Sequence, residues 1–274
     1  MKTEIRLAAK KDIPALCEMW GICFSDPEDY IKLFYSENFD RMKVFVYTLD
    51  GRPVCMANAF DSLFCDSGKT QKAIFLYAGC TLPEYRHNGY FKKLISFLKC
   101  LSDRTGAAIF FKPASPALAD FYRTLGLEVG SYFRLVTVNP VGKQPLSVSD
   151  ISFTEYNRMR DAAFGGIPYV RWDDEHIRWC VSENKYFNGR TLKTNYGSEN
   201  HFLMAYPSDD TLIINETDMS LGELKEFSGA LCDIFGTKLI KSYMPDSCGE
   251  GERIISSVIY NTDFRNIYIN QILL

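Results

Sequence analysis

The sequence lacks the features that mark several large classes of protein. Its 274 residues contain three histidines, and its nine cysteines form no Cys-x-x-Cys pair, so the usual spacing of metal ligands is missing. No apolar run approaches the ~20 residues that span a bilayer, and the first residues, Met1–Arg6, lack the apolar segment of a signal peptide. We therefore expect a cytoplasmic protein with no metal and no membrane partner, whose reduced cysteines, such as Cys100, are embedded in apolar surroundings.

An excess of charge of one sign is missing as well. Lys and Arg total 31 against 34 for Asp and Glu, which gives a formal net charge of −3 and no global basic field of the kind that nucleic-acid binding requires. The hydrophobic fraction of 46% and the charged fraction of 24% are typical of a soluble globular protein, and the length allows one to two domains. We expect small-molecule or protein partners and no nucleic acid.

The most informative segment is Thr81–Ile95, where an apolar run breaks at a proline and becomes an Arg/Gly turn that leads into an amphipathic helix. A strand, a turn and a helix in this order leave the first backbone N–H groups of the helix unpaired, at the positive end of the helix dipole. Gly89 lets the backbone approach a ligand closely. The segment therefore predicts an anion site, although an ordinary strand-to-helix turn fits the same residues.

Two segments resemble motifs of the GNAT N-acetyltransferases. Arg86, Gly89 and Phe91 occupy the three defining positions of the Arg/Gln-x-x-Gly-x-Gly/Ala turn that binds acetyl-CoA. Phe91 stands where a small residue is usual, and a ring there would crowd the pyrophosphate. Downstream, Ser115–Leu127 resembles the helix Asn-x-x-Ala-x-x-x-Tyr-x-x-x-Gly-Phe of the family, with Tyr122 at the tyrosine and Ser115 in place of the asparagine.

The resemblance implies an enzyme that transfers an acetyl group from acetyl-CoA, its co-substrate, directly to a primary amine. In this interpretation the backbone at Gly79, Cys80 and Thr81 lines the pantetheine arm and polarises the thioester carbonyl. Tyr122 is the general acid that protonates the departing thiolate. The other residues expected to bind the co-substrate lie in the turn or in the second motif: Arg86, His87, Asn88, Gly89, Tyr90, Phe91 and Ser115.

Several alternatives stay open. Tyr122 also fits a core tyrosine that packs on Leu118 and Leu125, and an acetyl-cysteine at Cys80 is a lesser alternative route. The whole chain also fits a non-catalytic acyl-CoA-binding regulatory module or an enzyme for a different acyl group, and the amine acceptor and self-association are unspecified. The candidates for the general base are acidic residues near the usual acceptor cleft: Glu28, Asp29, Glu37 and Asp61.

Hydrophobic periodicity predicts the elements of the first half of the chain. Helices are expected over 12–24 and 27–39, with Asp12 and Asp26 as N-caps, and Asp50-Gly51 between two β-rich runs predicts a hairpin. The later elements follow the order of the GNAT fold: strand 72–81, helix 89–104, strand 107–112, helix 116–125 and the extended run 132–138.

A polar, proline-containing stretch at 139–146 predicts a connector between two domains. We expect a GNAT acetyltransferase domain at 1–140 and a degenerate GNAT-like domain at 141–274, whose helix 220–235 begins at the cap Ser220 and whose tail, 265–274, is a strand. The junction 217–220 has no Arg-x-x-Gly turn and no basic residue, so it should hold no pyrophosphate.

The resemblance to tandem GNAT proteins gives this second domain a role in shaping the acceptor pocket or an oligomer interface, although a merely structural appendage is equally open. The predicted fold class is α/β. It comprises a GNAT acyl-CoA N-acyltransferase fold, with a mixed central sheet and flanking helices, and a second GNAT-like α+β domain.

Overall fold

The computed structural model describes residues 2–142, 144–196 and 199–269, without the side chains of 196 and 199. The chain divides into two compact units, each built from segments that are distant in sequence. The first unit comprises Met1–Leu63, Gln71–Val129 and Ser257–Asp263. The second comprises Phe64–Thr70, Gly130–Ser256 and Phe264–Leu274. The domain boundary near 140 stays a prediction, and each unit is described here by itself.

The first unit begins with a strand that the sequence did not indicate, β1 (Thr3–Leu7), followed by the turn η1 (Lys10–Asp12) and the two expected helices, α1 (Ile13–Phe24) and α2 (Glu28–Asn38). Asp12 stands at the N-cap position of α1, as predicted, but makes no capping hydrogen bond through its side chain, whereas the prediction for Asp26 is wrong because Pro27 holds the N-cap position of α2. Asp12 instead accepts hydrogen bonds from Arg6 at 2.7 and 3.0 Å. Asp26 accepts one from the indole of Trp20 at 2.6 Å.

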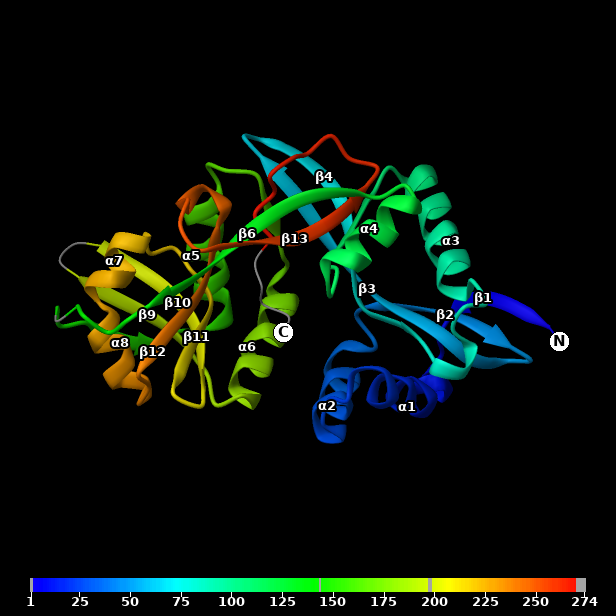
Figure 1. The fold of residues 1–274 in the computed structure, drawn as a ribbon, viewed down its shortest axis with the longest axis horizontal. Helices are drawn as coiled ribbons and strands as arrows, with labels where there is room; N and C mark the ends of the chain where they lie inside the picture. Colours follow the sequence, from blue (N-terminus) through cyan, green and yellow to red (C-terminus); the bar gives the residue numbers. More distant parts are fainter. Residues whose placement is uncertain (1, 143, 197–198, 270–274) are drawn as a thin grey trace. The chain divides into compact units, whose positions relative to one another are not determined.

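The sheet of the first unit has the order β1, β2 (Lys43–Leu49), β3 (Arg52–Asp66), β4 (Lys69–Thr81), β5 (Ala108–Phe111) and the last residues of β13 (Glu252–Tyr260). Figure 1 labels each of these strands except β5. The predicted hairpin is confirmed as β2 and β3, which pair antiparallel. Strands β4 and β5 pair in parallel only from Ala73↔Ala108 to Phe75↔Phe110, whereas β4 continues to Thr81. The two strands therefore part over the second half of β4.

Helices cover both faces of this sheet. The expected helices appear as α3 (Tyr90–Thr105) and α4 (Pro116–Thr124), and the aromatic rings of Phe45 on β2 and Phe97 on α3 lie 6.1 Å apart. Met56, which pairs with the residue next to Phe45, instead contacts the hydroxyl of Tyr35 on α2. Because neighbouring residues of a strand face opposite sides, α2 and α3 cover opposite faces.

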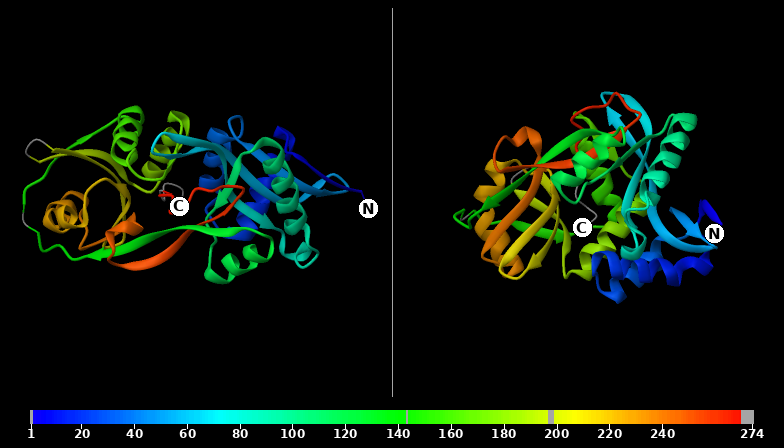
Figure 2. Two further views of the ribbon diagram at one scale, coloured as in Figure 1. Left: turned by 90° about the horizontal axis from the view of Figure 1, so that it is seen from above. Right: turned by 45° about the vertical axis from the view of Figure 1, so that its right-hand side comes forward.

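The sheet of the second unit has the order β6 (Glu128–Val138), β12 (Leu239–Pro245), β11 (Thr211–Thr217), β10 (Glu199–Ser208), β9 (Arg190–Tyr196) and β7 (Ser147–Asp150). The helices α5 (Phe153–Phe164) and α6 (Asp174–Tyr186) lie on one face (Figure 2). The helices α7 (Leu221–Glu226) and α8 (Ser228–Phe235) lie on the other. The short strand β8 (Tyr169–Arg171), the turn η3 (Asp246–Cys248) and, in the first unit, the turn η2 (Pro83–Tyr85) complete the described elements. The strand predicted at 265–274 does not form over 265–269, where Tyr268 makes a single bridge with Tyr169, and 270–274 lie outside the described residues.

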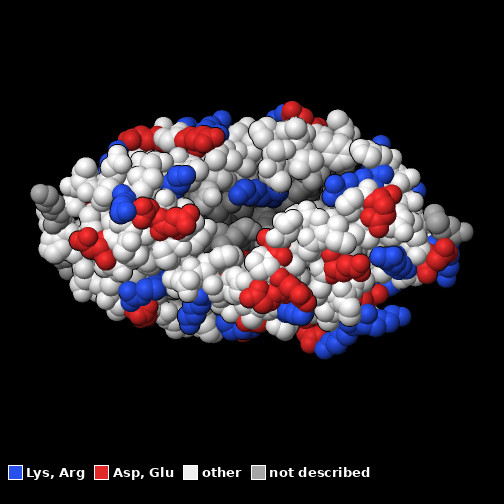
Figure 3. All heavy atoms as spheres, turned by 60° about the horizontal axis from the view of Figure 1, so that its bottom comes forward, with Lys and Arg blue, Asp and Glu red and all other residues white. Residues whose placement is uncertain are grey.

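The surface carries charges of both signs. On the face drawn in Figure 3, basic and acidic side chains are interspersed, as the small net charge leads one to expect. No helix among the described residues is long and apolar enough to cross a membrane. All nine cysteines are free, and Cys100, which we expected in apolar surroundings, is exposed on α3.

Helix 220–235 of the prediction is divided in two. Ser220 caps α7 as expected, but the helical hydrogen bonds break at Phe227, and α8 begins at Ser228. The reason is the expected connector, because Gly142 docks here: its N–H donates to the hydroxyl of Ser228 at 3.0 Å, and its carbonyl accepts from Gly229 at 3.1 Å. A Cβ on Gly229 would lie 2.3 Å from that carbonyl oxygen, so only glycine allows the approach.

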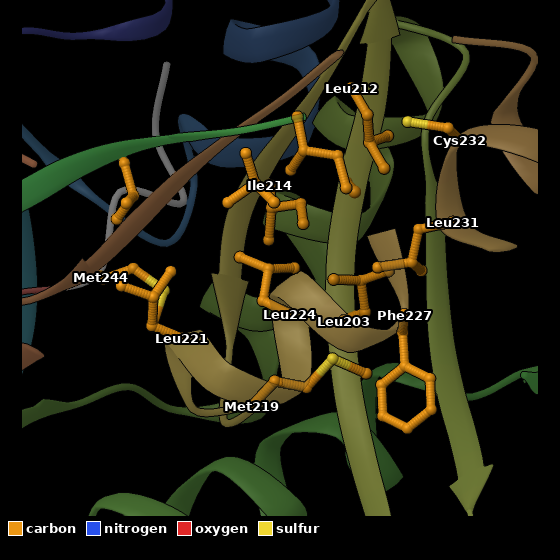
Figure 4. Close-up of a cluster of buried hydrophobic side chains, with 14 of the residues drawn as sticks. Leu203, Leu212, Ile214, Met219, Leu221, Leu224, Phe227, Leu231, Cys232 and Met244 are labelled. Atoms are coloured by element: carbon orange, nitrogen blue, oxygen red, sulfur yellow. The ribbon is translucent and has the colours of Figure 1, made fainter. Parts of the chain in front are cut away.

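A hydrophobic cluster joins α7 and α8 to their face of the sheet (Figure 4). Its side chains come from both helices and from five strands, and Leu203, Leu212 and Leu224 are fully buried. At roughly 25 cal/mol per Å² of apolar surface, each buried leucine stabilises the unit by about 1.5–3 kcal/mol. The cluster gives this face of the second unit its own core.

The other face of the same sheet buries an ion pair. Nε of Arg160, on α5, donates to both carboxylate oxygens of Glu216, on β11, at 3.1 and 3.0 Å, and both side chains have no exposed surface. Tyr156 adds a hydrogen bond to the same carboxylate at 2.6 Å. The guanidinium carbon lies 5.7 Å from the ring centre of Phe164 and 5.5 Å from that of Tyr169. Each charge is thus held in place by the other and by aromatic rings.

We predict that removing one charge of this pair is costly, because the other is left buried without compensation. Arg160→Met should lower the free energy of unfolding by about 3–5 kcal/mol, and the double variant Arg160→Met/Glu216→Leu should recover most of that loss. Urea unfolding of the full chain measures both. The control is Arg158→Met, the same change at an exposed position of the same helix. Equal losses in the single and double variants would contradict the prediction.

Candidate functional site

The candidate site begins where β4 has parted from β5 but still lies beside β3, since the N–H of Leu82 donates to the carbonyl of Val54 at 3.0 Å. Ala78 has a positive φ of 47°, which costs a residue with a side chain about 1–2 kcal/mol and kinks the strand. Gly79, Cys80 and Thr81 follow the kink, and β4 has by then parted from β5. Strain of this kind collects where a backbone is held in a special geometry, so the end of β4 is a candidate binding segment.

The turn after β4 is shaped by two residues with left-handed backbone. His87 has φ 65° and Gly89 has φ 72°, and Gly89 stands at the N-cap position of α3. No side chain of the described residues caps this end of the helix. A Cβ on Gly89 would meet nothing within 4 Å, so the space in front of the turn is open. The first N–H groups of α3 therefore face an open, positively polarised site.

The polar side chains of the turn are tied to its own backbone. Nδ2 of Asn88 donates to the carbonyls of Tyr85 and Arg86 at 3.1 and 3.0 Å, which holds the turn from within. Nε of Arg86 donates to the carbonyl of Thr81 at 3.2 Å, and Arg86 and His87 are both exposed. The turn thus presents a cation and backbone N–H donors to solvent.

The two aromatic residues that open α3 point back into the unit. Tyr90 stacks on Tyr47 of β2, with ring centres 4.7 Å apart. Phe91 lies against Gly79, where a Cβ built on the glycine would be 3.1 Å from the ring edge. Its ring centre is 6.3 Å from that of Tyr122. The ring of Phe91 therefore occupies space on β4 that a side chain at 79 would otherwise fill.

Tyr122 is buried, with 9% of its surface exposed, and its ring meets that of Phe111 edge-on at 4.6 Å. Burial raises the pKa of Tyr122 to about 12, so its hydroxyl keeps its proton at neutral pH. No hydrogen bond of that hydroxyl is found within the described residues. Ser115 caps α4, because its Oγ accepts a hydrogen bond from the N–H of Leu118 at 3.2 Å.

Sequence reasoning missed a cysteine at this site. Cys23, near the end of α1, places its sulfur 3.9 Å from Nη2 of Arg86 and 3.5 Å from the carbonyl oxygen of Thr81. The thiols of Cys23 and Cys80 influence each other's ionisation, so that the pKa of Cys23 is lowered to about 6 and that of Cys80 is raised. Because this proximity depends on how α1 packs against β4, no motif in the sequence around Cys23 predicts it.

The predicted residues thus fall into two contacting groups, and their roles stay predictions. Arg86 contacts Thr81 and Asn88, whereas Phe91 joins Gly79 to Tyr122. Two of the candidate bases lie in solvent-exposed ion pairs. These are Glu28 with Lys32 at 2.5 Å and Asp61 with Lys43 at 2.8 Å.

A comparison with protein families matches residues 4–130 to the family described as acetyltransferase (GNAT) domain. The match covers α1 to α4, the kinked end of β4 and the uncapped turn before α3. Residues 4–130, just under half of the chain, are thus similar to a GNAT acetyltransferase domain. No curated protein matches the sequence.

Solved structures share the fold over most of the chain. A probable N-acyltransferase from Enterococcus faecalis V583 has a TM-score of 0.74 at 12% identity, covering 94% of this chain and 72% of that one. A GCN5-related N-acetyltransferase from Kribbella flavida has a TM-score of 0.69 at 16% identity, with coverages of 94% and 71%. Eis1 from Mycobacterium abscessus has a TM-score of 0.65 at 12% identity, with coverages of 88% and 65%. Identities this low establish likeness of fold alone, and they confirm the predicted α/β class.

The close contact between Gly79 and Phe91 in the GNAT domain predicts a strong coupling of the two positions. Gly79→Ala should lower the free energy of unfolding by about 1–3 kcal/mol, because its Cβ would press on the ring. In a Phe91→Leu background the same change should cost less. A double-mutant cycle by urea unfolding measures the coupling, and Gly222→Ala, a helical position with open space, is the control. Additive losses would show that the contact is unimportant.

Proposed function

We propose that the GNAT domain transfers an acetyl group from acetyl-CoA to a primary amine. The observation that carries the proposal is the uncapped N-terminus of α3, where backbone N–H groups, the helix dipole and Arg86 converge on open space. Such a site favours a dianionic group like a pyrophosphate. The family that the domain resembles uses acetyl-CoA as its co-substrate, which fits this chemistry.

The residues present fit the rest of this co-substrate. The segment Gly79–Thr81 lies where β4 has parted from β5, so its backbone is available to an extended chain such as pantetheine. Gly79 itself is exposed. Phe91 lies against Gly79 and bounds this segment, while the N–H groups of the turn remain open. We assign the turn to the pyrophosphate and the end of β4 to the pantetheine arm.

When bound, acetyl-CoA supplies a reactive thioester and a thiolate leaving group. The protonated Oη of Tyr122 can donate a hydrogen bond to the negative charge that develops on the sulfur. Full transfer to a thiolate of ordinary pKa, about 8.5, is uphill by about 5 kcal/mol from a phenol of pKa about 12. Tyr122 therefore acts chiefly as a hydrogen-bond donor while the carbon–sulfur bond breaks, and its proton follows late.

We propose that the second unit is a degenerate GNAT-like domain that shapes the acceptor side or an interface, because the described junction between β11 and α7 offers no equivalent anion site. At the start of α7 the Oγ of Ser220 accepts from the N–H of Glu223 at 3.3 Å. The carboxylate of Glu223 in turn accepts from the N–H of Ser220 at 2.7 Å. This capping box satisfies the donors that α3 leaves open and adds a negative charge.

Calorimetric titration with acetyl-CoA tests the proposed site. Arg86→Ala should weaken binding about 10- to 100-fold, which corresponds to the loss of a charge-assisted hydrogen bond. Gly89→Glu should abolish binding, because it strains the turn and places a carboxylate at the anion site. Arg104→Ala, at the opposite end of α3, is the control for the loss of a positive charge. Gly89→Ala is the control for backbone strain without an added carboxylate. If the wild-type chain does not bind acetyl-CoA, the proposal is wrong.

Tyr122→Phe tests the catalytic role. We expect kcat to fall about 10- to 100-fold, because one hydrogen bond to a developing charge stabilises the transition state by a corresponding amount. The affinity for acetyl-CoA should be unchanged. Release of CoA thiol in the presence of a panel of primary amines measures the rate. The control is Tyr260→Phe, whose hydroxyl donates to Asp103 on the surface of the same unit. An unchanged kcat would remove Tyr122 from the chemistry, and binding without turnover by the wild-type chain would favour an acyl-CoA-binding regulatory module.

A further inference from the structure

Three cysteines from three different elements gather at the end of β4. Cys23 comes from α1, Cys55 from β3 and Cys80 from β4. The sulfur of Cys23 lies 3.5 Å from the carbonyl oxygen of Thr81, the residue that follows Cys80. Arg86 reaches the group from the turn, with Nη2 3.9 Å from the sulfur of Cys23. A cation beside a group of thiols is an arrangement that favours thiolate chemistry.

The three thiols differ in their surroundings. Cys23 is half-buried and faces Arg86, whereas Cys55 and Cys80 are buried. The thiol of Cys80, together with Arg86, lowers the pKa of Cys23 to about 6, against burial, the carboxylate of Glu84 and the negative end of the α1 dipole. The interaction with Cys23 and burial raise the pKa of Cys80, and burial raises that of Cys55 to about 12. Cys23 is therefore the thiolate of the group, and Cys80 is the protonated thiol beside it.

We propose that Cys23 and Cys80 form a redox-active pair, in which Cys23 reacts with a hydroperoxide and Cys80 resolves the product to a disulfide. The pair stands on geometry: the sulfur of Cys23 lies 3.5 Å from the carbonyl oxygen of the residue after Cys80, Cys23 is accessible, and a guanidinium nitrogen lies 3.9 Å from its sulfur. The nucleophile is on a helix and the resolving thiol on a strand, so the disulfide would tie α1 to the end of β4.

The chemistry balances with the hydroperoxide as oxidant. The thiolate of Cys23 attacks the terminal oxygen, the O–O bond breaks, and the alkoxide or hydroxide that leaves takes up a proton. Cys23 is then a sulfenic acid. The sulfur of Cys80 attacks that of Cys23, the S–O bond breaks, and the proton of Cys80 leaves with the hydroxide as water. Two thiols and one hydroperoxide thus yield a disulfide, an alcohol or water, and one further water.

Oxidation changes the neighbourhood of the anion turn. In the reduced state Arg86 lies beside the Cys23 thiolate, and the disulfide removes that negative charge. This consequence rests on the proposed function, because it concerns the residue assigned to the pyrophosphate. The proposed cysteine pair does not rest on that function, because disulfide formation is measured without acetyl-CoA.

The first experiment is alkylation of the full reduced chain by iodoacetamide across pH 5–9, with each cysteine followed by peptide mass spectrometry. Cys23 should react with a midpoint near pH 6. At pH 6.5 it should react roughly five times faster than the exposed Cys100, since its greater thiolate fraction outweighs its lower intrinsic nucleophilicity. In Arg86→Gln the midpoint should rise by about one pH unit, and in Arg104→Gln it should stay. Reaction of Cys23 no faster than Cys100 would overturn the proposal.

The second experiment adds one equivalent of hydrogen peroxide to the full chain and searches for linked peptides. We expect a Cys23–Cys80 disulfide in the wild-type chain, and in Cys80→Ser a sulfenic acid on Cys23 that dimedone traps. Cys23→Ser should give neither product, and circular dichroism checks that both variants fold. The same disulfide should form in Gly89→Glu, which removes the anion site, so failure of acetyl-CoA binding leaves this test intact. A wild-type chain that forms no linked peptide would overturn the resolving role of Cys80.

Discussion

The geometry of the candidate site depends on a left-handed backbone between β4 and α3. A strand that continued in extended conformation would carry the chain past the sheet, and a side-chain cap would close the end of the helix. His87 and Gly89 instead turn the chain sharply with positive φ, and Asn88 fixes the turn by donating to two of its carbonyls. The N–H groups of the first turn of α3 are left facing solvent, and Arg86 beside them is held to the end of β4. The anion site that we propose follows from that one bend.

The N-termini of α3 and α7 show that small differences in sequence distinguish an anion site from an ordinary helix N-terminus. Both contain a strand that leads through a short junction into a helix, β4 into α3 and β11 into α7. In the second, a serine and a glutamate satisfy the first donors, and the carboxylate repels an anion. The difference lies in two side chains, so a shared order of elements does not carry the binding chemistry with it.

Periodicity and turn residues predicted most of the helices, the hairpin at Asp50-Gly51 and the turn at Arg86, because these depend on local sequence. The errors arise where partners distant in sequence decide. Asp12 bonds Arg6 instead of capping α1, and Gly142 divides the helix expected at 220–235. Strand β13 is added to β5 from the far end of the chain, and Cys23 meets Arg86 only through the packing of α1. No local sequence pattern predicts any of these contacts.

The departure at Phe91 is explained by what lies opposite it. A phenylalanine at a position that favours small residues needs room, and the missing Cβ of Gly79 provides it. The ring then forms one wall beside Tyr122, with Phe111 edge-on against the same phenol. These apolar neighbours keep water from the hydroxyl and raise its pKa, which makes Tyr122 a poor acid in the free protein but a strong donor to any charge that develops beside it. In the role that we propose for Tyr122, this donation matters only when negative charge appears on the leaving sulfur, so the burial that weakens Tyr122 as an acid would concentrate its effect in the transition state.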